Sequence, residues 1–204
     1  MSRFRYFPIV IMLATASCNQ KSTVLVEDLA NFHSDTFVVD LSKSYYRLKP
    51  EIKLFEKKLG LPSLDTGFNG LQLRLTAGLK GDGLGYIVLT NQNNSWTGKY
   101  WKINYQLNMQ QDSFVSFQSL EKEIEPESGW SYLSRRLAEL DLLYLPDLSA
   151  TKSNGVLNVN VEFASKTQHR YYYMVEPDDY PDYPDAAKLT RIVKLLRKEF
   201  DIEF

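Results

Sequence analysis

The densest group of metal-binding side chain types lies near the C-terminal end of the sequence. Residues 176–185 (EPDDYPDYPD) combine five acidic residues with three prolines. Clustered carboxylates are the ligands that Ca²⁺ prefers, but an EF-hand loop also needs a central glycine and a closing glutamate, which this segment lacks. The prolines favour a stiff, solvated connection instead. We therefore predict no metal site here.

Histidines and paired acids are the next candidates for catalysis. His33 and His169 are the two histidines, and most of the chain separates them. Neither an HExxH zinc motif nor a G-x-S-x-G nucleophile elbow is present. Glu162 and Glu176 could face each other on neighbouring strands as a glycosidase-like pair, although acids on a solvated sheet face are common. We therefore predict no catalytic and no cofactor-binding residue.

Aromatic residues offer a different chemistry, which is binding. Trp96, Trp101 and Trp130, together with the tyrosines at 171–173, could form a platform for a glycan or a peptide. Strand alternation would place about half of these rings in the core. The glycine-rich stretch 81–85 (GDGLG) has no P-loop lysine and leads into a strand, so it indicates a turn rather than a nucleotide site.

The first 17 residues have the layout of a secretory signal. Arg3 and Arg5 precede an apolar run over residues 6–16 that ends in small residues. The run is shorter than the roughly twenty apolar residues that a membrane-spanning helix needs. We therefore expect an exported protein.

Cys18 is the only cysteine, and it stands where the apolar run ends. Thr15-Ala16-Ser17-Cys18 resembles a bacterial lipobox, although Thr15 departs from the usual leucine, and we predict lipidation of Cys18. Cleavage after Ala16 is the alternative. Lipidation predicts an outer-membrane or periplasmic lipoprotein; the alternative predicts a soluble periplasmic or secreted protein.

Alternating apolar and polar residues predict an antiparallel sheet of about five to six strands. Gly- and Asn-rich segments between the strands predict hairpin turns. The side that carries Gln, Arg, Lys, Asn and Glu is expected to face water. The predicted strands are 71–77, 84–90, 99–107, 156–163 and 169–176, with an edge strand at 114–120 and a short early strand at 36–41.

Helical periodicity predicts a short N-terminal helix from Pro50, a second helix over about 130–144 and a final helix to Phe200 with Asp185 as its N-cap. The fold class is α+β, with the last two amphipathic helices packed on one face of the sheet. We divide the chain into a signal peptide (1–17), a tether and lead-in (18–35) and a single α+β domain (36–204).

Several short stretches carry a resemblance: LQLRL (71–75), WTGKY (96–100), SGW (128–130), LPD (145–147), Gly155 before a strand, and the Tyr- and Pro-containing residues 171–184. They resemble an uncharacterised family of exported, lipoprotein-like proteins of Gram-negative bacteria with no assigned function. The resemblance covers most of residues 68–204. It implies a shared fold and compartment and brings no activity.

Charge and composition narrow the function further. The chain holds 24 basic and 25 acidic residues, so no overall positive field would attract nucleic acid. The leading hypothesis is a cell-envelope-anchored, non-enzymatic binding or interaction domain. Its expected partners are the membrane, through an N-terminal lipid anchor, and an envelope protein, a peptide or a glycan. The alternatives are a small hydrolase built from scattered Asp, Glu and His, and an immunity-type inhibitor of a toxin.

Overall fold

The computed structural model describes residues 45–79, 83–108, 113–145, 157–166, 169–175 and 182–203. Four predicted features lie outside these residues: the leader with Cys18, His33, the early strand at 36–41 and residues 176–181 of the acidic segment. What the sequence indicates about them stays a prediction.

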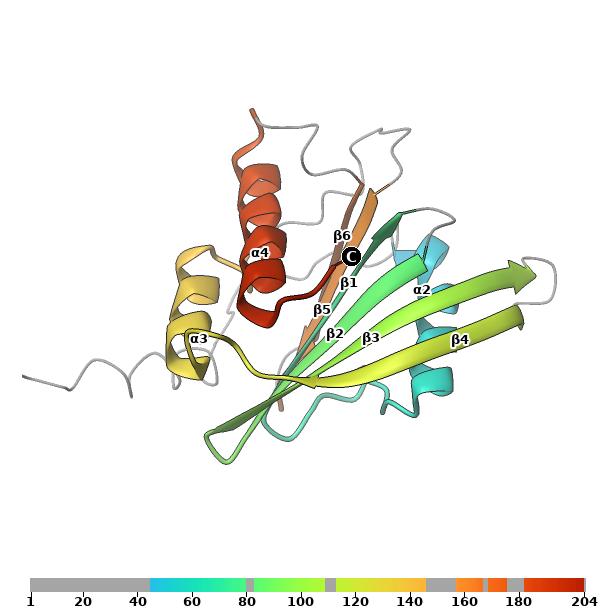
Figure 1. Ribbon diagram of the computed structural model, residues 1–204, viewed down its shortest axis with the longest axis horizontal. Helices are drawn as coiled ribbons and strands as arrows, with labels where there is room; N and C mark the ends of the chain where they lie inside the picture. The colour runs from blue at the N-terminus through green and yellow to red at the C-terminus, as the bar shows by residue number, and fades with distance from the viewer. Residues whose placement is uncertain are drawn as a thin grey trace, which may run out of the picture.

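The described strands form one antiparallel sheet of six strands in the order β4-β3-β2-β1-β5-β6 (Figure 1). This confirms the predicted α+β class and its antiparallel sheet. β1 lies inside the sheet, between β2 and β5, and β4 is an edge strand, as predicted. The bounds are β1 (Leu71–Leu79), β2 (Gly83–Gln92), β3 (Ser95–Asn108), β4 (Ser113–Ile124), β5 (Leu157–Ala164) and β6 (His169–Val175).

The described residues form three helices, α2 (Tyr45–Leu59), α3 (Trp130–Glu139) and α4 (Pro184–Phe200). α3 ends earlier than predicted because Asp141, just beyond its C-cap, takes a left-handed backbone with φ of 54°. The N-cap prediction for α4 was wrong. Tyr183 is the N-cap and Asp185 lies in the first turn, because Pro184 provides a first helical residue with its φ already fixed.

Helices cover both faces of the sheet. α3 and α4 lie together on one side of it, and α2 lies on the other (Figure 1). Leu133 of α3 and Leu189 of α4 belong to the same buried cluster as Leu75 of β1. Phe55 of α2 packs in a second cluster with Trp101 of β3. Burying each such side chain contributes about 1.5–3 kcal/mol, so each helix is held by its apolar stripe.

The polar side of the central strands is buried, which corrects the prediction that it faces water. Arg74 is 1% exposed and Glu162 is 5% exposed. Gln72, Thr76 and Asn160 beside them are buried too. α2 and the segment that follows it cover this face, and the polar groups bond to one another. The prediction fails because a period-two pattern shows which residues share a face and not whether another element covers that face.

The β2–β3 hairpin is tighter than the predicted loop over residues 91–98. β2 ends at Gln92 and β3 begins at Ser95, so only Asn93 and Asn94 form the turn. Their φ angles are 52° and 61°. Two positive φ angles are those of a type I′ turn, which matches the twist of the strands that it joins, and asparagine tolerates them.

Candidate functional site

A network of polar side chains fills the space between the sheet and α2, with Arg74 at its centre. Arg74 Nη1 donates to Glu56 Oε1 at 2.5 Å. Arg74 Nε and Nη2 donate to Gln72 Oε1 at 2.9 and 2.6 Å, and Nη2 also donates to the Pro62 carbonyl at 2.6 Å. The guanidinium is therefore held by a helix, its own strand and the segment after α2, and its orientation is determined.

The carboxylates around Arg74 perturb one another. Burial raises the pKa of Glu56 above its ordinary value of 4.5, the nearby Glu162 carboxylate raises it further, and Arg74 and Lys53 oppose this rise. Lys53 Nζ lies 3.2 Å from Glu56 Oε2 and 3.0 Å from Asp65 Oδ2. Acidic groups thus converge on this region from separate parts of the chain, with two basic side chains between them.

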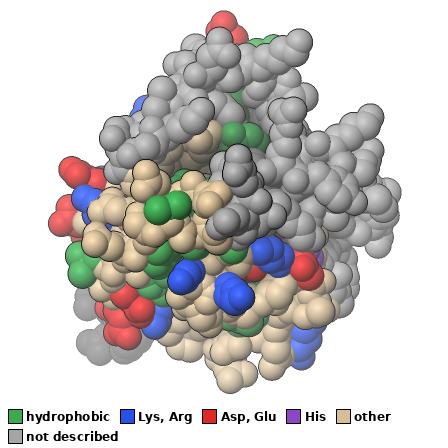
Figure 2. Space-filling model, turned by 90° about the vertical axis from the view of Figure 1, so that its right-hand side faces the viewer, with side chains coloured by type: hydrophobic (Ala, Val, Ile, Leu, Met, Phe, Trp, Pro, Cys, Tyr) green, Lys and Arg blue, Asp and Glu red, His purple; other side chains and the backbone are tan. Residues whose placement is uncertain are grey.

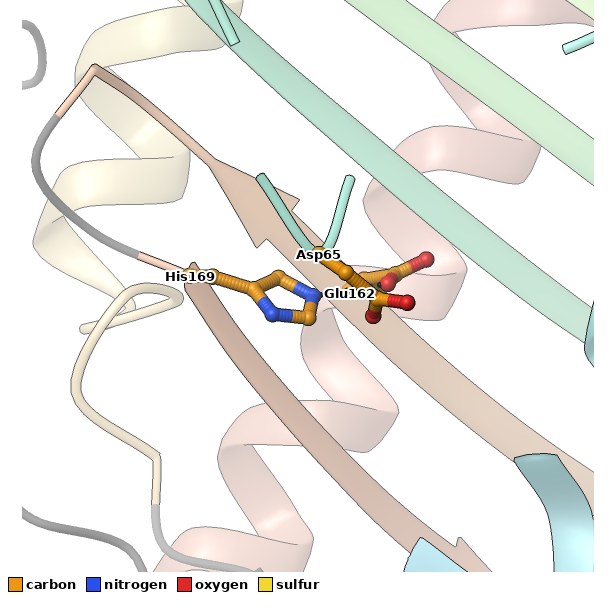
Figure 3. Close-up of side chains that lie close together, drawn as sticks. All are labelled: Asp65, Glu162 and His169. Atoms are coloured by element: carbon orange, nitrogen blue, oxygen red, sulfur yellow. Dashed lines mark hydrogen bonds and ion pairs between the residues drawn. The ribbon is translucent and has the colours of Figure 1, made fainter. Parts of the chain in front are cut away.

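Asp65, Glu162 and His169 meet beside this network (Figure 3). Asp65 lies in the turn before β1, Glu162 on β5 and His169 at the start of β6. His169 pairs with Ala164 across the hairpin, two residues from Glu162, so the two side chains are diagonal neighbours on one face. One nitrogen or carboxylate oxygen from each residue lies within 4.8 Å of the others. Imidazole nitrogen and carboxylate oxygen are both metal ligands and proton acceptors.

The two oxygens of Glu162 differ in their surroundings. Oε1 lies 2.8 Å from His169 Nε2. Oε2 is buried, has no hydrogen-bond partner and lies 3.9 Å from Arg74 Nη1. A buried carboxylate oxygen that accepts no hydrogen bond is costly, because the water it has lost is not replaced.

A second site lies toward the other edge of the sheet, around the three tryptophans. Trp96, Trp101 and Trp130 all line one pocket of about 450 Å³. The rings of Trp96 and Trp130 stack at 5.8 Å with an interplanar angle of 10°, and Trp130 also packs against Phe200 of α4. Trp96 and Trp130 thus come together as the sequence suggested, whereas Trp101 is 3% exposed and packs in the cluster under α2, on the other face of the sheet.

The tryptophan pocket also has charged walls. Glu121, Glu123 and Glu125 line it together with Lys99. Glu121 accepts hydrogen bonds from Lys99 Nζ at 2.6 Å and from Trp101 Nε1 at 3.1 Å. The Lys99 bond lowers the pKa of Glu121, which lies on the surface. The pocket therefore joins flat aromatic surface to three carboxylate side chains.

The side of the molecule at the right of Figure 1 carries charges of both signs. Figure 2 turns this side toward the viewer, and lysine, arginine and acidic side chains are interspersed over its described part. Among the described residues on this side, no extended surface carries a single sign of charge.

The structure brings some of the candidate residues from the sequence together and separates others. His169 and Glu162 come together, whereas Glu176 and His33 lie outside the described residues. The tyrosines at 171–173 do not extend the platform, because Tyr171 and Tyr172 are buried and their hydroxyls donate to Asn160 Oδ1 and to the Leu142 carbonyl. They point to opposite faces of β6.

Sequence analysis missed Asp65, Glu56 and Arg74. In the sequence Arg74 is only a polar position in an alternating strand, and its pairing with Glu162 on β5 is not visible there. Asp65 sits in an irregular turn, where no periodic signal exists. An arginine within an apolar strand was the one available sign, because arginine is rarely buried unless it is paired.

No helix among the residues that the structure describes is both long enough and apolar enough to cross a membrane. No protein-family model matches this sequence, and no curated protein shows significant similarity to it. The geometry of the two sites is therefore the basis for assigning a function.

Proposed function

We propose that this protein is a non-enzymatic binding domain of the cell envelope, tethered to a membrane by a lipid on Cys18 and binding its ligand in the tryptophan pocket. The observation that supports this proposal is the stacked pair of Trp96 and Trp130 in the lining of one pocket, which Trp101 also lines from a buried position. Pockets of about 300–1,000 Å³ suit small ligands or short segments of a partner, and this one has about 450 Å³.

The chemistry of the pocket favours a short peptide segment with a basic side chain. Three glutamates face one lysine along its walls, so its charge is negative. Indole rings attract an ammonium or guanidinium group by about 0.5–1 kcal/mol at exposed sites. Lys99 Nζ lies 5.9 Å from the centre of the Trp101 ring, and this contact supports a cation-binding role for the ring. A glycan would use the rings without needing the carboxylates.

Tryptophan fluorescence can test this proposal, because every tryptophan of the chain lines the pocket. The full chain is titrated with trilysine, with its fully acetylated form and with triacetylchitotriose. We expect trilysine to change the emission saturably and the acetylated peptide to have little effect. Glu123→Gln should weaken trilysine binding by about two- to fivefold, since it removes one exposed charge. Glu127→Gln, another exposed glutamate outside the pocket lining, is the matched control.

Two results would contradict the proposal. Saturable binding of the sugar without binding of trilysine would assign the pocket to a glycan. An equal loss of binding in the Glu123 and Glu127 variants would show that the peptide responds to overall charge and not to the pocket.

A small hydrolase is the second candidate, and one contact favours it. His169 Nε2 lies 2.8 Å from the buried Glu162 carboxylate, an arrangement in which an acid orients an imidazole base. Ester, phosphoester and peptide substrates can be screened with the wild type and with His169→Gln. Hydrolysis by the wild type and not by His169→Gln would favour the hydrolase over the proposed binding function.

A further inference from the structure

We infer that Asp65, Glu162 and His169 form a binding site for one divalent transition-metal ion, with Zn²⁺ as the best match. The site is separate from the tryptophan pocket, and the inference does not depend on the proposed function. The three residues come from a turn and two strands that are far apart in the sequence. One ligand atom from each lies within 4.8 Å of the others. Zinc bonds of about 2.0–2.2 Å place tetrahedral ligand atoms roughly 3.4 Å apart. Asp65 must therefore move inward, and the 2.8 Å contact between His169 Nε2 and Glu162 Oε1 must open slightly.

Asp65 is the residue that can make this movement. It is exposed and lies in the turn before β1, whereas Glu162 and His169 are held by the β5–β6 hairpin. Two ligands are therefore fixed in the sheet, and the third is carried on the more adjustable segment. This division lets an ion enter from the solvent side.

The buried oxygen of Glu162 gives an independent reason for a cation. Oε2 has no hydrogen-bond partner, and Arg74 does not supply one, because its nitrogens donate to Glu56, Gln72 and Pro62. Arg74 Nη1 stays 3.9 Å away. The Glu162 side chain is 5% exposed and keeps one acceptor without a hydrogen bond, while its other oxygen, Oε1, faces His169 Nε2 at 2.8 Å. A metal ion at this point would neutralise the carboxylate that hydrogen bonds leave incomplete.

Neighbouring charges permit a cation. Glu56, Asp65 and Glu162 bring three carboxylates, against the two basic side chains Lys53 and Arg74. Lys53 Nζ lies 3.0 Å from Asp65 Oδ2 and competes directly for that ligand. It also donates to Ser63 Oγ at 2.9 Å and lies 3.2 Å from Glu56 Oε2. Lys53 therefore keeps two partners when a metal takes Asp65.

The ligand types select the class of metal. One imidazole nitrogen with two carboxylates suits Zn²⁺ and its neighbours in the transition series better than Ca²⁺ or Mg²⁺, which take oxygen ligands almost exclusively. Three protein ligands leave a fourth position for water or a bound molecule. His169 is partly exposed, so that position is open toward solvent.

Calorimetric titration of the full chain with ZnCl₂ tests the inference, and Co²⁺ absorption reports the coordination geometry. We expect one Zn²⁺ per chain and a tetrahedral Co²⁺ spectrum. Asp65→Asn and His169→Gln should each weaken Zn²⁺ binding by at least about tenfold, since each removes a ligand. Asp141→Asn is the matched control for Asp65, because Asp141 is also a surface aspartate bonded to a lysine, Lys188. His33→Gln and Cys18→Ser test the other histidine and the single cysteine of the chain as alternative zinc ligands. Both variants should leave Zn²⁺ binding unchanged.

Absence of one-to-one Zn²⁺ binding by the wild type would overturn the inference. So would loss of binding in Asp141→Asn, His33→Gln or Cys18→Ser to the same extent as in the site variants. Urea unfolding of every variant shows whether it is folded. If His169→Gln is not, Asp65→Asn decides the outcome, because its side chain lies on the surface.

Discussion

Arg74 carries a full charge into the interior of the protein. Its hydrogen-bond donors must therefore find acceptors there. Its guanidinium donates to one carboxylate, one amide oxygen and one backbone carbonyl. Arg74 stabilises the ionised form of Glu56 only in part, because burial and the Glu162 carboxylate still raise the pKa of Glu56. The network therefore links α2 to β1 through a charged contact whose loss would leave an unpaired group in the interior.

Arg74→Met should lower the free energy of unfolding by about 3–5 kcal/mol, because the buried Glu56 would lose its closest cation and keep only Lys53. The double variant with Glu56→Met should lose clearly less, since both charges are replaced by apolar side chains of similar length. Urea denaturation of the wild type, both single variants and the double variant measures the coupling. A double variant whose loss equals the sum of the single losses would show that the two residues act independently.

At the scale of elements, β3 is shared between the two sides of the molecule. Trp101 packs in the cluster under α2, whereas Tyr100 belongs to the cluster under α3 and α4. Gly98 marks the point where β3, β4 and α3 come closest. A Cβ on Gly98 would lie 2.8 Å from the Ile124 carbonyl oxygen and 2.9 Å from the Trp130 ring. Glycine is thus required there for close packing and not for a special backbone angle.

Gly98→Ala should therefore destabilise the protein by about 1–3 kcal/mol, as overpacking does in other cores. Its added methyl group meets backbone atoms of β4, which cannot move without disturbing the strand pairing. Thr97→Ala, at the exposed neighbouring position, is the control and should change stability little. Thermal unfolding followed by circular dichroism measures both. Equal thermal unfolding midpoints for the two variants would show that β4 accommodates the added methyl group without loss of stability.

At the scale of the whole molecule, the described residues form one sheet with helices on both faces, and its two candidate sites lie apart. The predicted leader lies within residues 1–44, which are outside the described part of the chain. A lipid on Cys18 would add membrane affinity of about 0.8 kcal/mol for each buried methylene group. Residues 19–35 would then separate the membrane surface from the domain.

Cys18→Ala should release the protein from the membrane fraction, because the acylated residue is lost. Labelled palmitate should be incorporated into the wild type and not into the variant. Cell fractionation with immunodetection measures the release. A wild type that takes up no label would favour cleavage after Ala16 and a soluble exported protein.

The elements themselves could be predicted from the sequence. Alternation in β1, β3 and β5 and the apolar stripe of α4 depend on neighbours a few residues apart, and such local patterns can be seen without a fold. The same is true of the α+β class and the antiparallel pairing, because hairpin turns join successive strands. Element ends were less accurate, since a single backbone angle at Asp141 ends α3 and Pro184 shifts the start of α4.

Tertiary structure alone decided which polar groups are buried and which candidate residues meet. Asp65 and His169 are far apart along the chain and come within 4.8 Å of the same carboxylate only because β5 pairs with both β1 and β6. The placement of α2 over the sheet turned a face that alternation marked as polar into the interior. Sequence periodicity records which side chains share a surface. What covers that surface depends on contacts between distant segments, and no local pattern carries that information.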